Sequence, residues 1–154
     1  MKTHIFALLA ASLLSSAALA QVTVTDPWVR ATVPQQKSAG AFMRLQSATP
    51  ARLVAVRSPL ARAEIHSMQM EGGVMKMQAV EGIDLPAGKA VNLASGGYHV
   101  MLFNLTRQLK EGETVPLTLV VEDVKRKRHE VSVNAAVKPI GYSAPRPAGE
   151  HAGH

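Results

Sequence analysis

The chain has 154 residues, of which 47% are hydrophobic, and it carries a formal net charge of +6. Cysteine is absent, which excludes disulfides, thiol redox chemistry and thiolate metal sites. A basic chain with one Trp, two Tyr and no recognisable nucleic-acid module is not expected to bind nucleic acid.

The first twenty residues, MKTHIFALLAASLLSSAALA, carry a lysine near the start, then an apolar run, then an Ala-Leu-Ala ending. This layout is typical of a cleavable signal peptide and is too short for a membrane span. We therefore expect residues 1–20 to be removed before Gln21 and the protein to be periplasmic. Because no cysteine follows the apolar run, we expect no lipid anchor, and no later stretch predicts a membrane span.

Residues 21–139 consist of short segments in which apolar and polar residues alternate, separated by Pro and Gly. Alternation with period two predicts strands, and no window shows a long helical period. Many short strands joined by turns predict a single all-β domain, either a sandwich or a barrel. The clearest segments are VTVTDPWVR at 22–30, ARLVAVRS at 51–58, VNLASGGYHVMLFNL at 91–105 and TVPLTLVVEDV at 114–124.

Methionine is concentrated in the middle of this domain, in IHSMQM at 65–70 and GGVMKM at 72–77. The pair Gly72–Gly73 predicts a two-residue hairpin turn, because both glycines tolerate positive φ. Since alternate side chains of a strand share a face, one histidine and four methionines should gather on one face of this hairpin. In the expected register Met70 lies opposite Met75, Met68 lies opposite Met77, and His66 is diagonal to Met77.

A third segment, GGYHVML at 96–102, carries His99 and Met101 two residues apart and therefore on one face. A neighbouring strand would bring this pair against the hairpin, grouping imidazoles and thioethers without a carboxylate. Thioether sulfur is a soft ligand that suits Cu(I), whereas zinc prefers His, Cys and carboxylates. The group favours a Cu(I) site, but the methionines could instead fill the core while the histidines are satisfied at the surface.

The other features of the sequence indicate less about function. No Ser-His-Asp or Cys-His arrangement and no paired acids near the histidines are visible, so an enzyme is not expected. The run KRKRH at 125–129 favours a solvated turn over a surface for an acidic partner. From 140 to 154 the chain is rich in Pro, Gly and Ala and is expected to be a flexible tail, which holds His151 and His154.

The spacing of four side chains resembles the signature of the periplasmic PCuAC copper-chaperone family. Ten residues separate His66 from Met77, twenty-one separate Met77 from His99, and one separates His99 from Met101. The resemblance covers residues 24–133 and includes flanking segments: DPWVR, SAGAF, LPAGKAVNL and LKEGETVPLTLVVE. Two departures, Ser67 after the first histidine and Ser95 before the paired glycines, leave the four positions intact.

The resemblance implies a cupredoxin-like Greek-key β fold that binds one Cu(I) and delivers it to the CuA subunit of cytochrome c oxidase, alongside a Sco-type thiol protein. The implied ligands are His66, Met77, His99 and Met101, with Met68 as a possible auxiliary ligand. Some relatives carry a Cu(II)-binding extension, of which His151 and His154 would be a sparse version. Two alternatives remain: a periplasmic copper buffer for resistance, and a β-sandwich interaction module that binds no metal.

Overall fold

The structure is a computed structural model that describes residues 22–145, and all the regular structure of these residues is β-strand. The expectation of an all-β domain is therefore confirmed. The expected signal peptide and the tail histidines His151 and His154 lie outside the described residues. The strands are β1 (Val22–Arg30), β2 (Ser38–Ser47), β3 (Ala51–Arg57), β4 (Arg62–Glu71), β5 (Val74–Ala79), β6 (Ile83–Leu85), β7 (Ala90–Leu93), β8 (His99–Phe103), β9 (Thr114–Asp123) and β10 (Arg128–Lys138).

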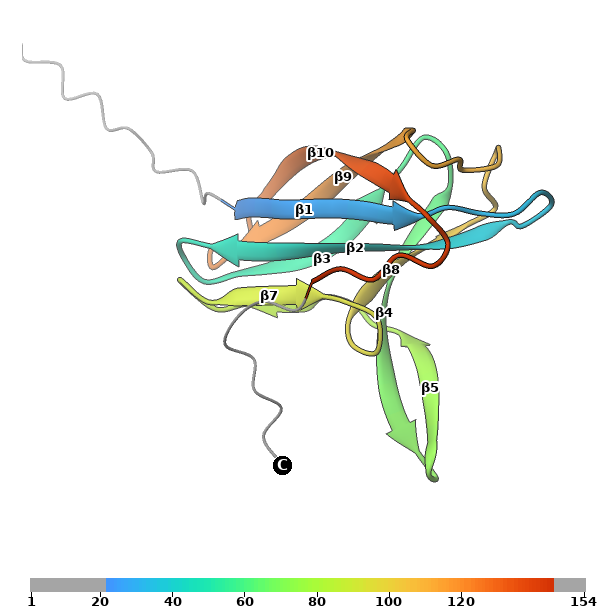
Figure 1. Ribbon diagram of the computed structural model, residues 1–154. Helices are drawn as coiled ribbons and strands as arrows, with labels where there is room; N and C mark the ends of the chain where they lie inside the picture. Colours follow the sequence, from blue (N-terminus) through green and yellow to red (C-terminus); the bar gives the residue numbers. More distant parts are fainter. Residues whose placement is uncertain (1–21, 146–154) are drawn as a thin grey trace, which may run out of the picture.

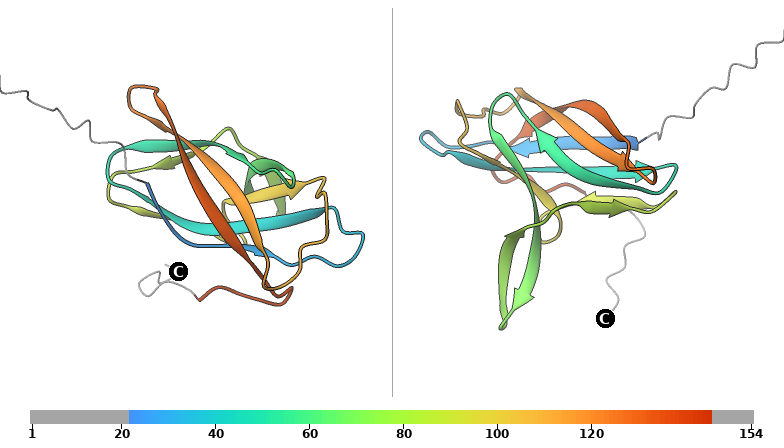
Figure 2. Two further views of the ribbon diagram at one scale, coloured as in Figure 1. Left: turned by 90° about the horizontal axis from the view of Figure 1, so that it is seen from above. Right: turned by 180° about the vertical axis from the view of Figure 1, so that it is seen from behind.

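The strands form one hydrogen-bonded sheet in the order β5-β4-β8-β2-β1-β10-β9-β3-β6, with β7 also paired to β2. The β1–β10 pair is parallel, and the other strand pairs are antiparallel. The sheet curls over itself, so that β3 approaches β4 and two layers enclose the core (Figures 1 and 2). The return of β10 beside β1 and the insertion of β8 between β4 and β2 give the Greek-key order that was expected.

The core lies between the two layers and is made by the inward-facing residues of the alternating strands. Leu45 on β2, Leu102 on β8 and Leu53 on β3 are fully buried, together with Leu117 and Leu119 on β9. Burying an aliphatic side chain of this size stabilises a fold by about 1.5–3 kcal/mol. This core supports the sheet without any disulfide, as the absence of cysteine requires.

A β-bulge in β1 positions the aromatic side chain of Trp28. The register with β2 shifts between Thr25 and Trp28, and Asp26 has a positive φ of 49°. Pro27 lies within this irregularity, where its missing N–H costs no ladder hydrogen bond. As a result Trp28 is buried and its ring lies 4.6 Å from that of Phe42, measured between centroids.

The β4–β5 hairpin leaves the body of the sandwich as a two-stranded arm (Figures 1 and 2). Its turn is made by Gly72 and Gly73, both at positive φ, as a primed two-residue turn requires. The expected register is confirmed, with Met70 opposite Met75 and Met68 opposite Met77. All six residues of β5 are exposed, so the outer half of the arm contributes little to the core.

The segment after β10 lies against β1 as far as the structure describes it, to residue 145. The Arg30 guanidinium donates to the carbonyl oxygens of Ile140, at 2.6 Å, and Tyr142, at 3.0 Å. The Tyr142 ring also packs edge-on against Trp28, with 4.9 Å between centroids. These contacts hold the first residues of the expected tail on the sheet.

The basic run KRKRH spans the connection from β9 to β10: its first three residues lie in the exposed turn, as expected for a solvated segment, and Arg128 and His129 begin β10. The Asp123 carboxylate accepts from the backbone N–H groups of Lys125 and Lys127 and pairs with His129. Among residues 22–145, we found no helix long and apolar enough to cross a bilayer.

Candidate metal centre

His66 and His99 lie directly opposite each other on the neighbouring strands β4 and β8. Their ring centroids are 5.9 Å apart. Each residue is only 6% exposed, although histidine side chains commonly lie at the surface. The pairing of β4 with β8 therefore brings two imidazoles, distant in sequence, to one buried point at the base of the arm.

Met77 reaches this point from β5. In the hairpin register His66 pairs with Ala79, which leaves Met77 diagonal to His66 on the same face, as expected. The Met77 sulfur lies 3.1 Å from Nε2 of His99. Met77 is also 45% exposed, so its thioether links the buried imidazoles to solvent.

Met101 lies on β8, two residues after His99, and so shares its face. It pairs with Gly40 on β2 and with Glu64 on β4, and it is partly buried. A Cβ atom at Gly40 would lie 2.8 Å from Cζ of Phe42, so the glycine leaves room for that ring. The Phe42 ring in turn flanks His99, with 6.3 Å between centroids.

The protonation of His99 follows from its hydrogen bond to the backbone. Its Nδ1 lies 3.0 Å from the carbonyl oxygen of Gly97, which can only accept, so Nδ1 carries the hydrogen. In the neutral ring Nε2 then has a lone pair, and it faces the Met77 sulfur, which is also only an acceptor. In this tautomer of the neutral ring, two electron-pair donors meet, an arrangement suited to a shared cation.

The same Gly97 carbonyl also accepts from the backbone N–H of Met68, at 3.3 Å. Gly96, the preceding residue, has a φ of 88°, a conformation that side chains other than glycine rarely adopt. The paired glycines before β8 therefore form a turn that fixes His99 and ties it to β4.

His66 is held by a carboxylate. Its Nε2 lies 2.9 Å from a Glu64 carboxylate oxygen, and the other oxygen of Glu64 pairs with Arg62. With the hydrogen on Nε2, Nδ1 keeps its lone pair, and this atom is buried without a hydrogen-bond partner. An unsatisfied buried acceptor is uncommon and points to a missing ion or water.

The pKa of His66 lies below its ordinary value of 6.5, chiefly because the ring is buried and secondly because Arg62 is positively charged. The Glu64 carboxylate would favour the protonated ring, but its own pairing with Arg62 offsets that effect. His66 is therefore neutral at pH 7, and its Nδ1 is available as a donor atom.

The donor set determines which ions fit. Among residues 22–145, no group of three or more His, Cys, Asp or Glu side chains is placed to hold a metal. A metal at this point would therefore be bound by the two imidazoles together with thioethers. Such neutral, soft donors suit Cu(I) and are poor ligands for Mg²⁺ or Ca²⁺.

The remaining methionines and histidines of the described residues fall into four places. Met68 lies opposite Met77 on the same face and is partly buried, so it borders the site. Met70 and Met75 are exposed on the outer part of the arm. Met43 is buried in the core, and His129 lies near the start of β10, paired with Asp123. If the methionines filled the core and the histidines lay at the surface, Met77 would be buried and both histidines exposed. The structure shows the opposite, because His66 and His99 are buried while Met77 is exposed.

Three groups that support the site were not predicted from the sequence: Glu64, Phe42 and the Gly97 carbonyl. The expectation of a group without a carboxylate is wrong, because Glu64 contacts His66. Glu64 could have been predicted to contact His66, because it precedes His66 by two residues and so shares its face in a strand. The roles of Phe42 and Gly97 depend on the pairing of β2 and β8 and on the turn before β8, which alternation alone does not specify.

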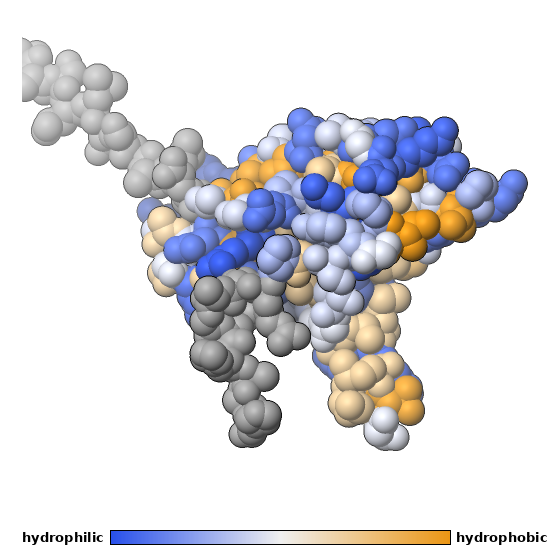
Figure 3. Space-filling model, in the orientation of Figure 1, coloured by the Kyte–Doolittle hydropathy of each residue, from blue (hydrophilic) through white to orange (hydrophobic). Residues whose placement is uncertain are grey.

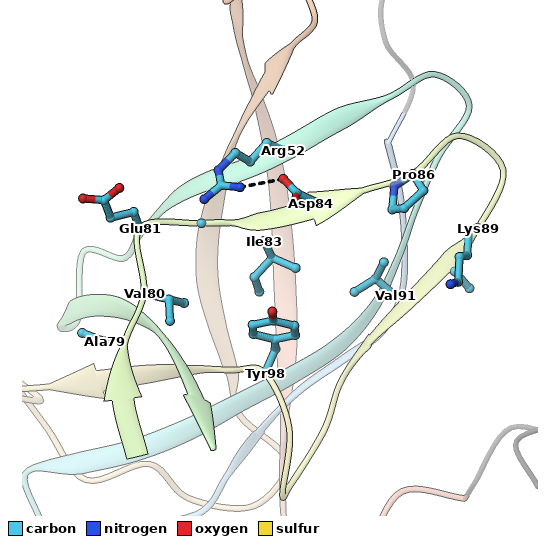
Figure 4. Close-up of a pocket in the computed structure, with 12 residues that line it drawn as sticks. Arg52, Ala79, Val80, Glu81, Ile83, Asp84, Pro86, Lys89, Val91 and Tyr98 are labelled. Carbon is cyan, nitrogen blue, oxygen red and sulfur yellow. Dashed lines mark hydrogen bonds and ion pairs between the residues drawn. The ribbon is translucent and has the colours of Figure 1, made fainter. Parts of the chain in front are cut away.

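A surface cavity of about 690 Å³ lies apart from these residues, between the β5–β6 connection and β7. Figure 4 shows Tyr98 facing Ile83 across it, with the Arg52–Asp84 ion pair, 2.6 Å long, at its edge. Its lining contains neither histidine nor methionine, so the metal-binding chemistry does not lie in this cavity.

A family model described as "Putative lipoprotein LpqE-like" matches residues 22–137, which include every residue of the candidate site. The chain belongs to this LpqE-like family. A curated relative, "Putative lipoprotein Lxx21020" of Leifsonia xyli subsp. xyli, is 32% identical over 104 residues, or 66% of this chain. The chain spans about 63% of the length of that relative.

Solved structures similar to this LpqE-like chain are PCuAC domains, which confirms the resemblance drawn from the sequence. The apo PCuAC domain of PmoF2 is 27% identical, with a TM-score of 0.65 over 83% of this chain and 98% of that one. The copper-bound form of the PmoF2 domain has a TM-score of 0.63 and 28% identity, over 79% and 96% of the two chains. Cu(I)-bound DR1885 of Deinococcus radiodurans is 32% identical, with a TM-score of 0.55 over 80% and 83%.

Proposed function

We propose that this protein is a copper carrier that binds one Cu(I) through His66, Met77, His99 and Met101. The observation that supports it most directly is the contact between Nε2 of His99 and the Met77 sulfur, two lone-pair donors 3.1 Å apart. Similarity to solved PCuAC domains that hold copper supports the same assignment. Four neutral donors favour the singly charged ion, because Cu(I) prefers soft ligands.

The site suits transfer rather than catalysis or permanent storage. Met77 is 45% exposed, so an acceptor's ligand would approach from solvent and bind the ion before the buried imidazoles release it. In this exchange Cu(I) keeps its oxidation state, and the Met77 thioether, which does not titrate, gives up no proton. The protein acts in this proposal as a carrier and not as an enzyme.

The proposed carrier works in the periplasm, after cleavage of a signal peptide before Gln21. Membership of a lipoprotein-like family fits an exported or envelope protein. Its proposed acceptor is the CuA subunit of cytochrome c oxidase, in cooperation with a Sco-type thiol protein that supplies the thiol chemistry this cysteine-free chain lacks. His151 and His154 would add a weak Cu(II) site, since imidazole suits Cu(II).

The metal assignment is tested by titrating Cu(I) into the reduced, metal-free protein against a competing chromogenic chelator. We expect the wild type to take up one tightly bound ion and the H66A/M77A double variant to lose it. H129A is the matched control, because His129 is a partnered histidine on β10, a strand that does not pair with β4, β5 or β8. Unchanged Cu(I) affinity in a folded H66A/M77A variant would contradict the proposal.

Delivery and buffering are separated by deleting the gene. For delivery we expect cytochrome oxidase activity to fall and to be restored by added copper. Copper sensitivity with normal oxidase activity would favour the buffer instead, because a buffer protects against excess metal but supplies no particular acceptor.

A further inference from the structure

The outer part of the β4–β5 arm exposes methionines that the proposed site does not use. Met70 on β4 is 66% exposed and Met75 on β5 is 45% exposed, and the β4–β5 arm extends beyond the body of the sandwich (Figures 1 and 3). Methionine commonly fills gaps in cores, but the outer arm has no core to fill. Core packing therefore does not explain why methionine occupies these two exposed positions.

The register arranges these methionines as a continuous row that ends at the candidate site. Met70 lies directly opposite Met75, and Met68 lies opposite Met77, whose sulfur contacts His99. Directly opposed side chains of antiparallel strands have Cβ atoms about 4.5–5.5 Å apart, close enough for two thioethers to share one ion. The row thus links the tip of the arm to the buried imidazoles.

The opposite face of the arm differs sharply in chemistry. Gln69 pairs with Lys76 and Ser67 pairs with Gln78 on that face, and Lys76 forms an ion pair with Glu71 at 3.4 Å. Thioethers are therefore confined to the face that carries His66. This segregation indicates a function for the sulfur atoms, because solubility alone would be served by polar residues on both faces.

We propose that Met70 and Met75, assisted by Met68, form a second and weaker Cu(I) site, through which the ion moves along the arm to and from the histidines. The proposal rests on the proposed function for its direction of transfer. Each step exchanges one thioether for another on the same Cu(I), so no electron is transferred and no proton is released. Thioether ligands select Cu(I) over hard divalent ions, which makes the row selective as well.

Methyl NMR of protein labelled with [methyl-13C]methionine tests the site directly, under reducing and oxygen-free conditions. We expect the first equivalent of Cu(I) to shift the methyl signals of Met77 and Met101, and the second to shift those of Met70 and Met75. A second equivalent that leaves both tip signals unmoved would overturn the second site. Shifts at Met70 and Met75 without any at Met77 and Met101 would support the tip site and contradict the proposed function.

The M70L/M75L variant removes both sulfurs while nearly conserving side-chain volume and polarity. We expect it to keep the first equivalent, to lose the second, and to release Cu(I) more slowly to a chromogenic chelator. M43L is the matched control, because Met43 is a buried core residue away from the arm. A second equivalent and a release rate that both equal those of M43L would overturn the proposal.

Discussion

At the scale of single residues, the candidate site depends on groups that fix which nitrogen of each histidine is free. The Gly97 carbonyl holds the hydrogen of His99 on Nδ1, and Glu64 holds that of His66 on Nε2. The free nitrogens, Nε2 of His99 and Nδ1 of His66, are then the proposed donors. Partners of this kind raise the basicity of a ligand and reduce the reorganisation that metal binding requires.

The Glu64→Ala variant is therefore expected to weaken Cu(I) binding by roughly 10–100-fold, the usual effect of removing an outer partner of a histidine ligand. Glu64→Gln keeps an oxygen acceptor and should lose less. Chelator competition measures the affinity, and 15N NMR of the imidazole reports whether the hydrogen of His66 leaves Nε2.

Glu71→Gln is the control for Glu64, because Glu71 lies on the polar face of the same strand. If Glu64→Ala binds Cu(I) as tightly as Glu71→Gln and keeps the hydrogen on Nε2, Glu64 does not position His66.

At the scale of elements, the β9–β10 turn is stabilised by hydrogen bonds to the Asp123 carboxylate. Asp123 has a lowered pKa, chiefly because His129 hydrogen-bonds to its carboxylate and also because the backbone N–H groups of Lys127 and Lys125 donate to it. A carboxyl group whose pKa is lowered in the folded state stabilises the fold at pH values above its unfolded-state pKa. This contribution is lost as pH falls through the folded-state pKa. The turn should therefore weaken in acid.

The Asp123→Asn variant is expected to lower the melting temperature of the metal-free protein at pH 7, and the difference from wild type should shrink as pH falls from the ordinary carboxyl value of 3.8 through the lowered pKa of Asp123. Thermal unfolding followed by circular dichroism at several pH values measures this. Glu111→Gln, on the exposed β8–β9 connection, provides the control. A difference that persists undiminished in acid would show that the carboxylate charge is not responsible.

The hairpin could be predicted in detail because its information is local. Alternation places His66, Met68 and Met70 on one face, and Gly72–Gly73 sets the turn and hence the register. The exposure of the arm could not be predicted, because alternation shows which side chains share a face but not where the sandwich ends. Contacts that depend on distant pairing, such as Tyr142 on Trp28, leave no local pattern to detect.

At the scale of the whole molecule, the sandwich positions the two histidines of the candidate site. The two imidazoles are opposed because β4 pairs with β8, and β8 is held in turn by β2. The buried core fixes these strands, so little ordering remains when an ion binds. The arm, which carries Met77, extends outside this frame (Figure 2). The molecule thus joins a rigid pair of histidines to exposed thioethers, which suits a carrier that must both hold and release its ion.

The central claim, that imidazoles and thioethers together bind Cu(I), is tested most directly by copper X-ray absorption on protein loaded with one equivalent. We expect both sulfur and nitrogen scatterers around the metal in the wild type, in M43L and in M68L/M70L/M75L, and the loss of sulfur scattering when M77L/M101L is added to M68L/M70L/M75L, which lacks the other thioethers of the arm. A copper environment of nitrogen and oxygen alone in the wild type, or sulfur scattering that persists undiminished in that five-fold variant, would contradict the proposed site.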